Sequence, residues 1–253
     1  MTEILTQPLP YAVAPADLFE LVVNLPWAQL LDSGNVAGPR GRYDIISADP
    51  YLKITTQQGV STMTNRSGEI IDTARNPFKL LTKELLPFHG QSPEIPFCGG
   101  AMGYFGYNLL NDAEQTDDRQ SCIQRIPDMA IGVYDWAIIT DHELGETYLV
   151  SAGKDERSQE TIHRLLNSVS VPSSPAITPS SSPLVVDHLE TDIDREIYQD
   201  GFARIQKYLL DGDCYQINYA RCFFANTSGS SWESYKQLRK ANPVPFGAYL
   251  NYP

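Results

Sequence analysis

The chain has 253 residues, of which 42% are hydrophobic and 20% charged, a composition typical of a folded globular protein. Its formal net charge of -12 repels phosphate backbones and anionic lipid, so we expect no nucleic acid and no membrane as partners. The first residues form neither a basic nor a continuous apolar segment, and the four cysteines form no C-x-x-C pair. We therefore expect a cytoplasmic protein with reduced thiols and no zinc site.

The first part of the chain is predicted to combine one short helix with several strands. Apolar residues at helical spacing predict a helix over 17–24, which Pro26 ends. Alternating apolar residues predict three strands, the last two joined by a turn at Gln58-Gly59. These strands are 42–48, 51–56 and 60–64.

The middle of the chain is predicted to hold a capped helix and a glycine-rich stretch. The helix runs from Pro77 to Leu86, with Asn76 as its N-cap. Its buried stripe is expected to be Phe78, Leu81 and Leu85. The four glycines within 97–109 lack the spacing of a dinucleotide-binding loop, which favours close packing of the backbone against a neighbouring element.

Residues 127–142 are predicted to form one strand in a sheet that is covered on both sides, because apolar residues occupy both of its faces. A turn at Leu144-Gly145 leads into an antiparallel partner strand over 147–151. A helix is predicted over 155–166.

A run of serines and prolines over 168–183 is expected to be an exposed linker. We therefore predict an amino-terminal domain over 1–167, a linker over 168–187 and the beginning of a second domain over 188–253. The second domain is predicted to contain a helix capped by Thr191-Asp192 and followed by Gly212, a strand over 214–224, a helix over 231–241 and a strand over 246–252. The sequence stops at Pro253 with that last strand unpaired, so we expect the natural chain to continue.

Two patches of the sequence carry a functional signal, 25–50 and 212–250. Judged by residue type alone, Ser33 fits an ordinary turn. Arg42 and Asp44 likewise fit an ion pair at the surface. The amides of Gln216 and Asn218 fit simple ties to neighbouring backbone. Val244 is held between two prolines, which suits a stiff pocket wall and equally a plain loop.

Six motifs in order resemble the component I family of anthranilate synthases and aminodeoxychorismate synthases. They are LLDSG (30–34), RYDIISADP (42–50), GGAMGYFGY (99–107), PDMAIGVYDWA (127–137), GDCYQIN (212–218) and NPVPF (242–246). The resemblance implies an α+β fold in which antiparallel β-sheets pack face to face with outer helices. With Asn218, the fifth motif resembles that of the aminodeoxychorismate synthases rather than that of the anthranilate synthases. The aminodeoxychorismate branch of the family serves folate and para-aminobenzoate synthesis.

The implied activity is that of a large subunit that aminates chorismate with ammonia from a glutamine amidotransferase partner. The alternative within the family is anthranilate synthase component I, and an alternative of another class is a stand-alone aromatic amino-acid-binding regulatory module. The resemblance also implies Mg²⁺ on chorismate, with its ligands outside this chain. The family's Ser-Pro-Glu-Arg-Phe and Pro-Ile-Lys-Gly-Thr motifs are absent from the sequence, so we predict no catalytic and no metal-binding residue here, and no activity from this chain alone.

The resemblance further implies a tryptophan-like pocket between the two patches. Asp32 is expected to pair with the ammonium group of the ligand. Arg40 and Gly41 stand where relatives vary, and Gly247 lacks a hydroxyl that others carry. The predicted pocket residues are Ser33, Arg40, Gly41, Arg42, Tyr43, Pro245, Phe246 and Gly247.

Overall fold

The computed structural model describes residues 4–36, 38–88, 94–110, 126–170 and 182–252. The chain divides into a larger compact unit, 1–178 with 235–253, and a smaller one, 179–234. Residues 235–253, which the sequence assigns to the second domain, thus belong with the larger unit. Most of the predicted linker, 171–181, lies outside the described residues. No helix within the described ranges is long and apolar enough to cross a membrane.

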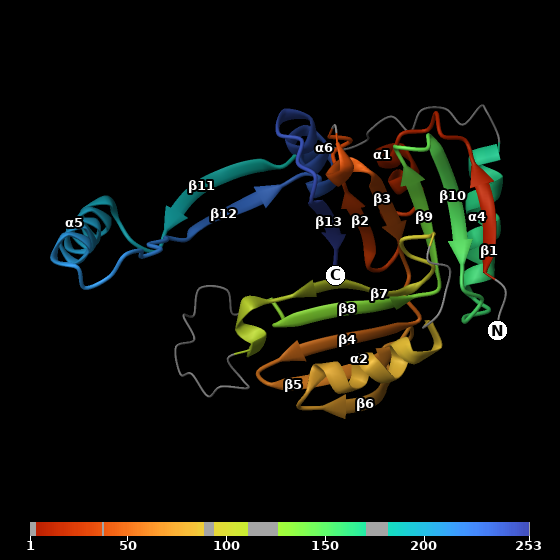
Figure 1. Cartoon of the computed structure of the whole chain (residues 1–253), viewed down its shortest axis with the longest axis horizontal. Coiled ribbons are helices and arrows are strands. Elements are labelled where there is room, and N and C mark those ends of the chain that lie inside the picture. Colours follow the sequence, from red (N-terminus) through yellow and green to blue (C-terminus); the bar gives the residue numbers. More distant parts are fainter. Residues whose placement is uncertain (1–3, 37, 89–93, 111–125, 171–181, 253) are drawn as a thin grey trace. The chain divides into compact units, whose positions relative to one another are not determined.

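The larger unit contains two antiparallel sheets together with helices, which confirms the predicted α+β class (Figure 1). In spatial order the first sheet contains β1 (Leu5–Leu9), β10 (Glu146–Ser151), β9 (Trp136–Asp141), β3 (Tyr43–Ser47), β2 (Ala28–Asp32) and β13 (Gly247–Asn251). The second contains β6 (Ile70–Ala74), β5 (Val60–Asn65), β4 (Leu52–Gln57), β8 (Met129–Tyr134) and β7 (Gly100–Phe105). The sheets contact one another: the side-chain amide of Gln29 donates to the Met102 carbonyl over 3.4 Å, and the hydroxyl of Tyr252, just after β13, donates to the Ala130 carbonyl over 3.0 Å.

The helices of this unit agree with the predicted ones except at their ends. The first helix is shorter than predicted and ends at Glu20, six residues before the proline expected to end it. The helix predicted over 155–166 begins and ends later. The elements are α1 (Pro15–Glu20), α2 (Pro77–Leu85), α4 (Ser158–Ser170), residues 235–241 of α6 (Ser231–Ala241), and the short 3₁₀ turns η1 (Pro39–Gly41), η2 (Leu86–Phe88) and η3 (Tyr107–Leu110).

The single strand predicted over 127–142 is wrong, because the chain changes sheet at Asp135. β8 lies in the second sheet and β9 in the first, and every residue of both strands is buried. The Asp135 carboxylate is also buried and accepts hydrogen bonds from the Lys154 amide (2.6 Å) and the Ser151 hydroxyl (3.2 Å). Burial raises the pKa of Asp135 above its ordinary value, and these hydrogen bonds oppose that effect only in part.

The glycine-rich stretch forms β7, and its predicted close backbone packing is confirmed. A Cβ at Gly103 would collide with the carbonyl oxygen of Ala130 on the neighbouring strand, and φ there is +153°. The predicted turn at Gln58-Gly59 is also confirmed, since both residues have positive φ, as a two-residue hairpin turn requires.

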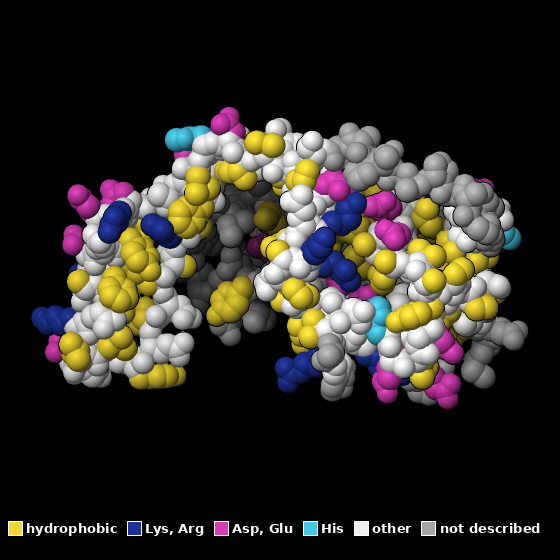
Figure 2. Space-filling view, turned by 90° about the horizontal axis from the view of Figure 1, so that it is seen from above, with side chains coloured by type: hydrophobic (Ala, Val, Ile, Leu, Met, Phe, Trp, Pro, Cys, Tyr) yellow, Lys and Arg dark blue, Asp and Glu magenta, His cyan; other side chains and the backbone are white. Residues whose placement is uncertain are grey.

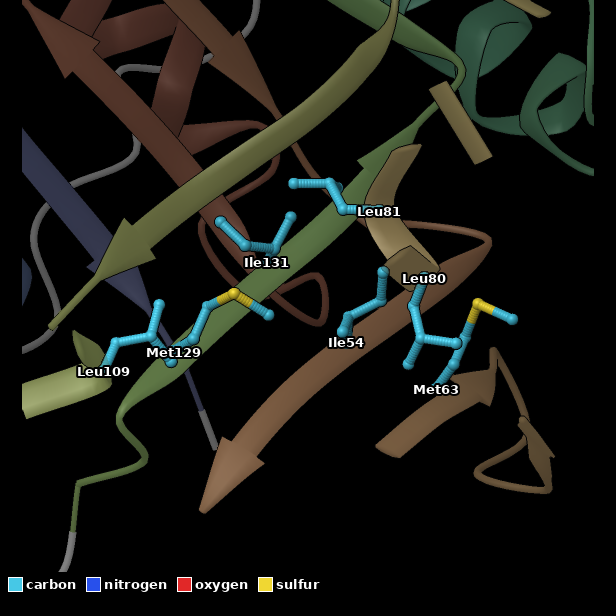
Figure 3. Close-up of a cluster of buried hydrophobic side chains, with 7 residues drawn as sticks. All are labelled: Ile54, Met63, Leu80, Leu81, Leu109, Met129 and Ile131. Carbon is cyan, nitrogen blue, oxygen red and sulfur yellow. The ribbon is translucent and has the colours of Figure 1, made fainter. Parts of the chain in front are cut away.

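Helix α2 covers one face of the second sheet and builds a hydrophobic core there (Figure 3). The Asn76 side chain caps it by accepting from the Phe78 amide over 3.0 Å, as predicted. The predicted stripe needs correction, because Phe78 is exposed and Leu80 faces the core instead. The cluster consists of Ile54, Met63, Leu80, Leu81, Leu109, Met129 and Ile131.

The smaller unit is a two-stranded antiparallel ribbon of β11 (Val185–Thr191) and β12 (Phe223–Ser228) with helix α5 (Arg195–Asp211). The N-cap of α5 is Asp194, not Thr191-Asp192, while Gly212 ends the helix with φ +81° as predicted. The strand predicted over 214–224 is wrong for most of its length, since β12 begins only at Phe223. Many apolar side chains of this unit are exposed, including Val185, Leu189 and Phe202. Figure 2 shows hydrophobic side chains over the surface of this unit, at the left of the view.

The last strand is not unpaired as the sequence led us to expect. β13 pairs antiparallel with β2, and the register places Gly247 opposite Asp32 and Asn251 opposite Ala28. The hydrogen bond from the side-chain amide of Asn251 to the Val23 carbonyl (2.7 Å) further ties this strand to the amino-terminal part of the larger unit. This pairing brings together the two patches that carry the functional signal.

Candidate functional site

The segment after β2 and the segment before β13 lie side by side. Gly34 has φ +64°, and a Cβ added to it would lie 2.7 Å from the carbonyl oxygen of Val244. Only a residue without a side chain therefore allows this approach of the two backbones. Residues 32–34 and 244–247 are consequently neighbours in space although they are about two hundred positions apart in sequence.

Asp32 is the polar centre of this junction. Its side chain is 2% exposed and accepts from the Gly34 amide (2.7 Å), the Tyr235 hydroxyl (2.8 Å) and Nε of Arg239 (2.5 Å). Burial alone would raise the pKa of Asp32, but the hydrogen bonds from Arg239, Gly34 and Tyr235 outweigh it and hold the pKa below its ordinary value. The hydrogen bond to Asp32 in turn raises the pKa of Arg239, so both groups are charged at neutral pH.

A hollow of about 210 Å³ lies beside this ion pair. Its walls combine the two charged side chains with apolar groups, a tyrosine and an amide. This combination is typical of sites for small amphiphilic ligands. The lining residues are Asp32, Gly34, Tyr235, Leu238, Arg239, Asn242, Val244, Gly247 and Ala248.

Buried hydrogen bonds fix the position of Ser33. The Ser33 amide donates to Asp44 over 2.6 Å, and the other carboxylate oxygen of Asp44 bonds Nε2 of His142 over 2.7 Å. The Ser33 hydroxyl donates to the carbonyl of Gly41 over 3.2 Å. These contacts fix the loop that follows β2, so Asp44 is a buried anchor rather than half of a surface pair with Arg42.

A second hollow, of about 440 Å³, is lined by the loop that follows β2 and by the turn after β9. Arg42 lines this hollow, but its guanidinium group forms ion pairs with Asp141 (2.8 Å) and Glu143 (3.0 Å). Gly41 also lines it, and a Cβ there would collide with the carbonyl oxygen of Val36. Its lining residues are Asn35, Val36, Gly38, Gly41, Arg42, His142 and Glu143.

The predicted pocket residues are thus distributed over several environments, and their binding role stays a prediction. Gly247 lines the first hollow. Tyr43 packs on the core cluster of Ala137, Ile139 and Val150. Arg40 is exposed, Pro245 is half-buried, and Phe246 is 80% exposed at the turn before β13.

Sequence reasoning missed Tyr235 and Arg239, which complete the site from α6. They are four residues apart and so lie on one face of that helix. This spacing was visible in the sequence, but what the face contacts depends on the pairing of β2 with β13, which no local pattern encodes.

The described residues offer no metal site: no group of three or more His, Cys, Asp or Glu side chains among them is arranged to hold an ion. Mg²⁺ therefore has no fitting ligand set in the described parts of this chain. Cys98, Cys214 and Cys222 form no disulfide within the described ranges, and Cys122 lies outside them.

Comparison with known proteins shows which family this chain resembles. The family described as chorismate binding enzyme matches residues 31–253. Aminodeoxychorismate synthase component 1 of Salmonella typhimurium is 36% identical over 96% of this chain and 52% of its own length. The chloroplastic anthranilate synthase alpha subunit 2 of Arabidopsis thaliana is 27% identical over 94% of this chain and 41% of its own length.

A solved structure supports the same fold. Anthranilate synthase component I from Streptococcus pneumoniae superimposes with a TM-score of 0.63 at 22% identity, over 82% of this chain and 47% of that one. The chain therefore spans about half the length of the relatives that it matches.

Proposed function

The chain belongs to the chorismate binding enzyme family, and we propose that it is a segment of the large subunit of aminodeoxychorismate synthase. In this proposal the whole subunit aminates chorismate to 4-amino-4-deoxychorismate with ammonia from a glutamine amidotransferase partner. The observation that carries the proposal is the identity of 33 to 36% to three enterobacterial aminodeoxychorismate synthases, against 27% or less for the anthranilate synthases compared.

The proposal gives this chain a binding and scaffolding role rather than a catalytic one. Mg²⁺, when bound in the whole subunit, would neutralise the charge of the chorismate carboxylate. No cluster among the described residues fits that ion, and we propose that its ligands lie in the part of the whole subunit that this chain does not span. The chain alone is accordingly expected to leave chorismate unchanged.

Product analysis tests the assignment. The whole subunit, its amidotransferase, glutamine, Mg²⁺ and chorismate are incubated, and the products are separated by liquid chromatography with mass detection. Formation of 4-amino-4-deoxychorismate supports the proposal, whereas formation of anthranilate would replace it with anthranilate synthase. Consumption of chorismate by the 253-residue chain alone would overturn the scaffolding role.

We also propose that the junction of 32–34 with 244–247 binds an aromatic amino acid such as tryptophan. Support comes from the mixture of charged, apolar and aromatic groups around the hollow of about 210 Å³. An apolar cavity of about 150 Å³ holds a benzene ring, so this volume suits one aromatic ring, and an indole with its amino-acid group requires the hollow to widen.

Such a ligand would stabilise the folded chain by mass action. At 100 times its Kd, a ligand that binds only the folded state adds about 2.7 kcal/mol to the free energy of unfolding. Saturating L-tryptophan is therefore expected to raise the melting temperature of the chain. Equal melting temperatures with and without L-tryptophan, and with L-phenylalanine, would count against the pocket.

A further inference from the structure

We infer that the interface between the two sheets binds one buried water molecule, at the side-chain carbonyl oxygen of Gln29. Gln29 lies on β2 and is 0% exposed, and its side chain reaches the second sheet. Within the described ranges, its Oε1 atom is the one buried side-chain nitrogen or oxygen atom that has no hydrogen-bond partner. This water site depends on neither the proposed reaction nor the amino-acid pocket.

The nitrogen of the Gln29 amide fixes the orientation of the group. Nε2 donates to the Met102 carbonyl over 3.4 Å and to the Tyr252 hydroxyl oxygen over 3.1 Å. A half-turn of the amide would place Oε1 against the Met102 carbonyl oxygen instead, and two acceptors form no hydrogen bond with one another. The carbonyl oxygen therefore stays on the side where the described residues provide no donor.

Tyr252 cannot supply the missing hydrogen bond. A tyrosine hydroxyl has a single proton to donate. The proton of Tyr252 is donated to the Ala130 carbonyl over 3.0 Å. Burial raises the pKa of Tyr252 above its ordinary value, so the hydroxyl stays protonated at neutral pH and keeps this bond. The donor for Oε1 must come from another molecule.

Water fits the hydrogen bonds that this network leaves open. An amide oxygen that is buried without a donor loses the hydrogen bonds that it would make in bulk water, and native proteins rarely tolerate that loss. Buried waters satisfy such atoms and typically form about two to four hydrogen bonds. The Tyr252 oxygen offers a second acceptor in the same network, because it accepts once from Gln29 and has another lone pair.

The surroundings favour a neutral guest over a cation. The rings of Trp27 and Tyr104 pack in T-shaped geometry against Tyr252, with centroid distances of 4.7 and 5.7 Å. Among the described residues, no carboxylate bonds Gln29 or Tyr252. The Lys53 ammonium group already lies 5.9 Å from the centroid of the Trp27 ring. A bound cation would therefore be buried near a positive charge and without a counter-ion, which is costly.

A crystal structure of the 253-residue chain, at a resolution that shows individual waters, tests the inference directly. The crystals are grown without ammonium salts, so that density at the site cannot come from an ammonium ion. We expect one peak about 2.7–3.0 Å from Oε1 of Gln29. An empty site, or a donor group of the protein against Oε1, would overturn the inference. A peak that appears only after ammonium is added would also overturn it.

Oxygen-17 relaxation dispersion counts long-lived internal waters and tests the same site in solution. Gln29→Met keeps the length of the side chain but removes the acceptor, so this variant should lose one long-lived water relative to the wild type. Gln57→Met, at an exposed position at the end of β4, is the matched control and should keep the wild-type count. An unchanged count in Gln29→Met would contradict the inference. If Gln29→Met does not fold, the crystal structure of the wild type decides.

Discussion

Replacing Gly34 with alanine tests the approach of the two site segments. Gly34 lies at φ +64°, a left-handed conformation that costs a residue with a Cβ about 1–2 kcal/mol. The new methyl group would also lie 2.7 Å from the carbonyl oxygen of Val244 and 3.0 Å from its amide nitrogen. Both neighbours are backbone atoms and cannot rotate away, so overpacking adds about 1–3 kcal/mol. We therefore expect Gly34→Ala to lower the free energy of unfolding by about 2–5 kcal/mol.

The matched control is Gly68→Ala. Gly68 has φ +88°, and nothing lies within 4 Å of its would-be Cβ, so this variant carries the backbone strain alone. Urea unfolding followed by the fluorescence of the buried Trp27 and Trp136 compares the two variants. A difference of less than about 0.5 kcal/mol between them would refute the close approach of Gly34 to Val244.

Three further substitutions test the scaffold around the site. Arg66→Met should cost about 2–3 kcal/mol of stability, because Arg66 bridges Asp49 (3.0 Å) and Asp155 (2.7 Å). Its removal would leave both half-buried carboxylates without their positive partner. Asn76→Ala should cost about 1 kcal/mol through loss of the α2 cap, measured by urea unfolding. Burial raises the folded-state pKa of Asp135, so the folded state favours the protonated carboxyl group. The contribution of this group to stability is therefore complete below the unfolded-state pKa of about 3.9 and is lost as pH rises through the folded-state pKa. Asp135→Asn should therefore gain stability over the wild type as pH rises above about 4, and a pH-independent difference would contradict this.

Local patterns predicted most of the central elements because those elements carry strong local signals. The capped helix α2 and the hairpin of β4 and β5 follow from an N-cap asparagine and a two-residue turn. The edge strands β1 and β6 were missed because most of their side chains are exposed and show no apolar alternation. The change of sheet at Asp135 was missed for the opposite reason, since β8 and β9 are buried on both faces and no alternation marks the break.

The site was predicted only in part because it depends on long-range strand pairing. The motifs around Ser33 and Gly247 identified the two segments that meet. They did not identify Arg239, which reaches Asp32 from a helix 207 positions away. They also misjudged Asp44, whose partner His142 belongs to the turn after β9.

Hydrogen–deuterium exchange with and without saturating L-tryptophan tests the central claim, that 32–34 and 244–247 enclose one amino-acid site. Amides in both segments are predicted to exchange more slowly with the ligand, whereas those of α5 and of the β11–β12 ribbon are predicted to keep their rates. Protection confined to one of the two segments, or absent from both, would contradict the account.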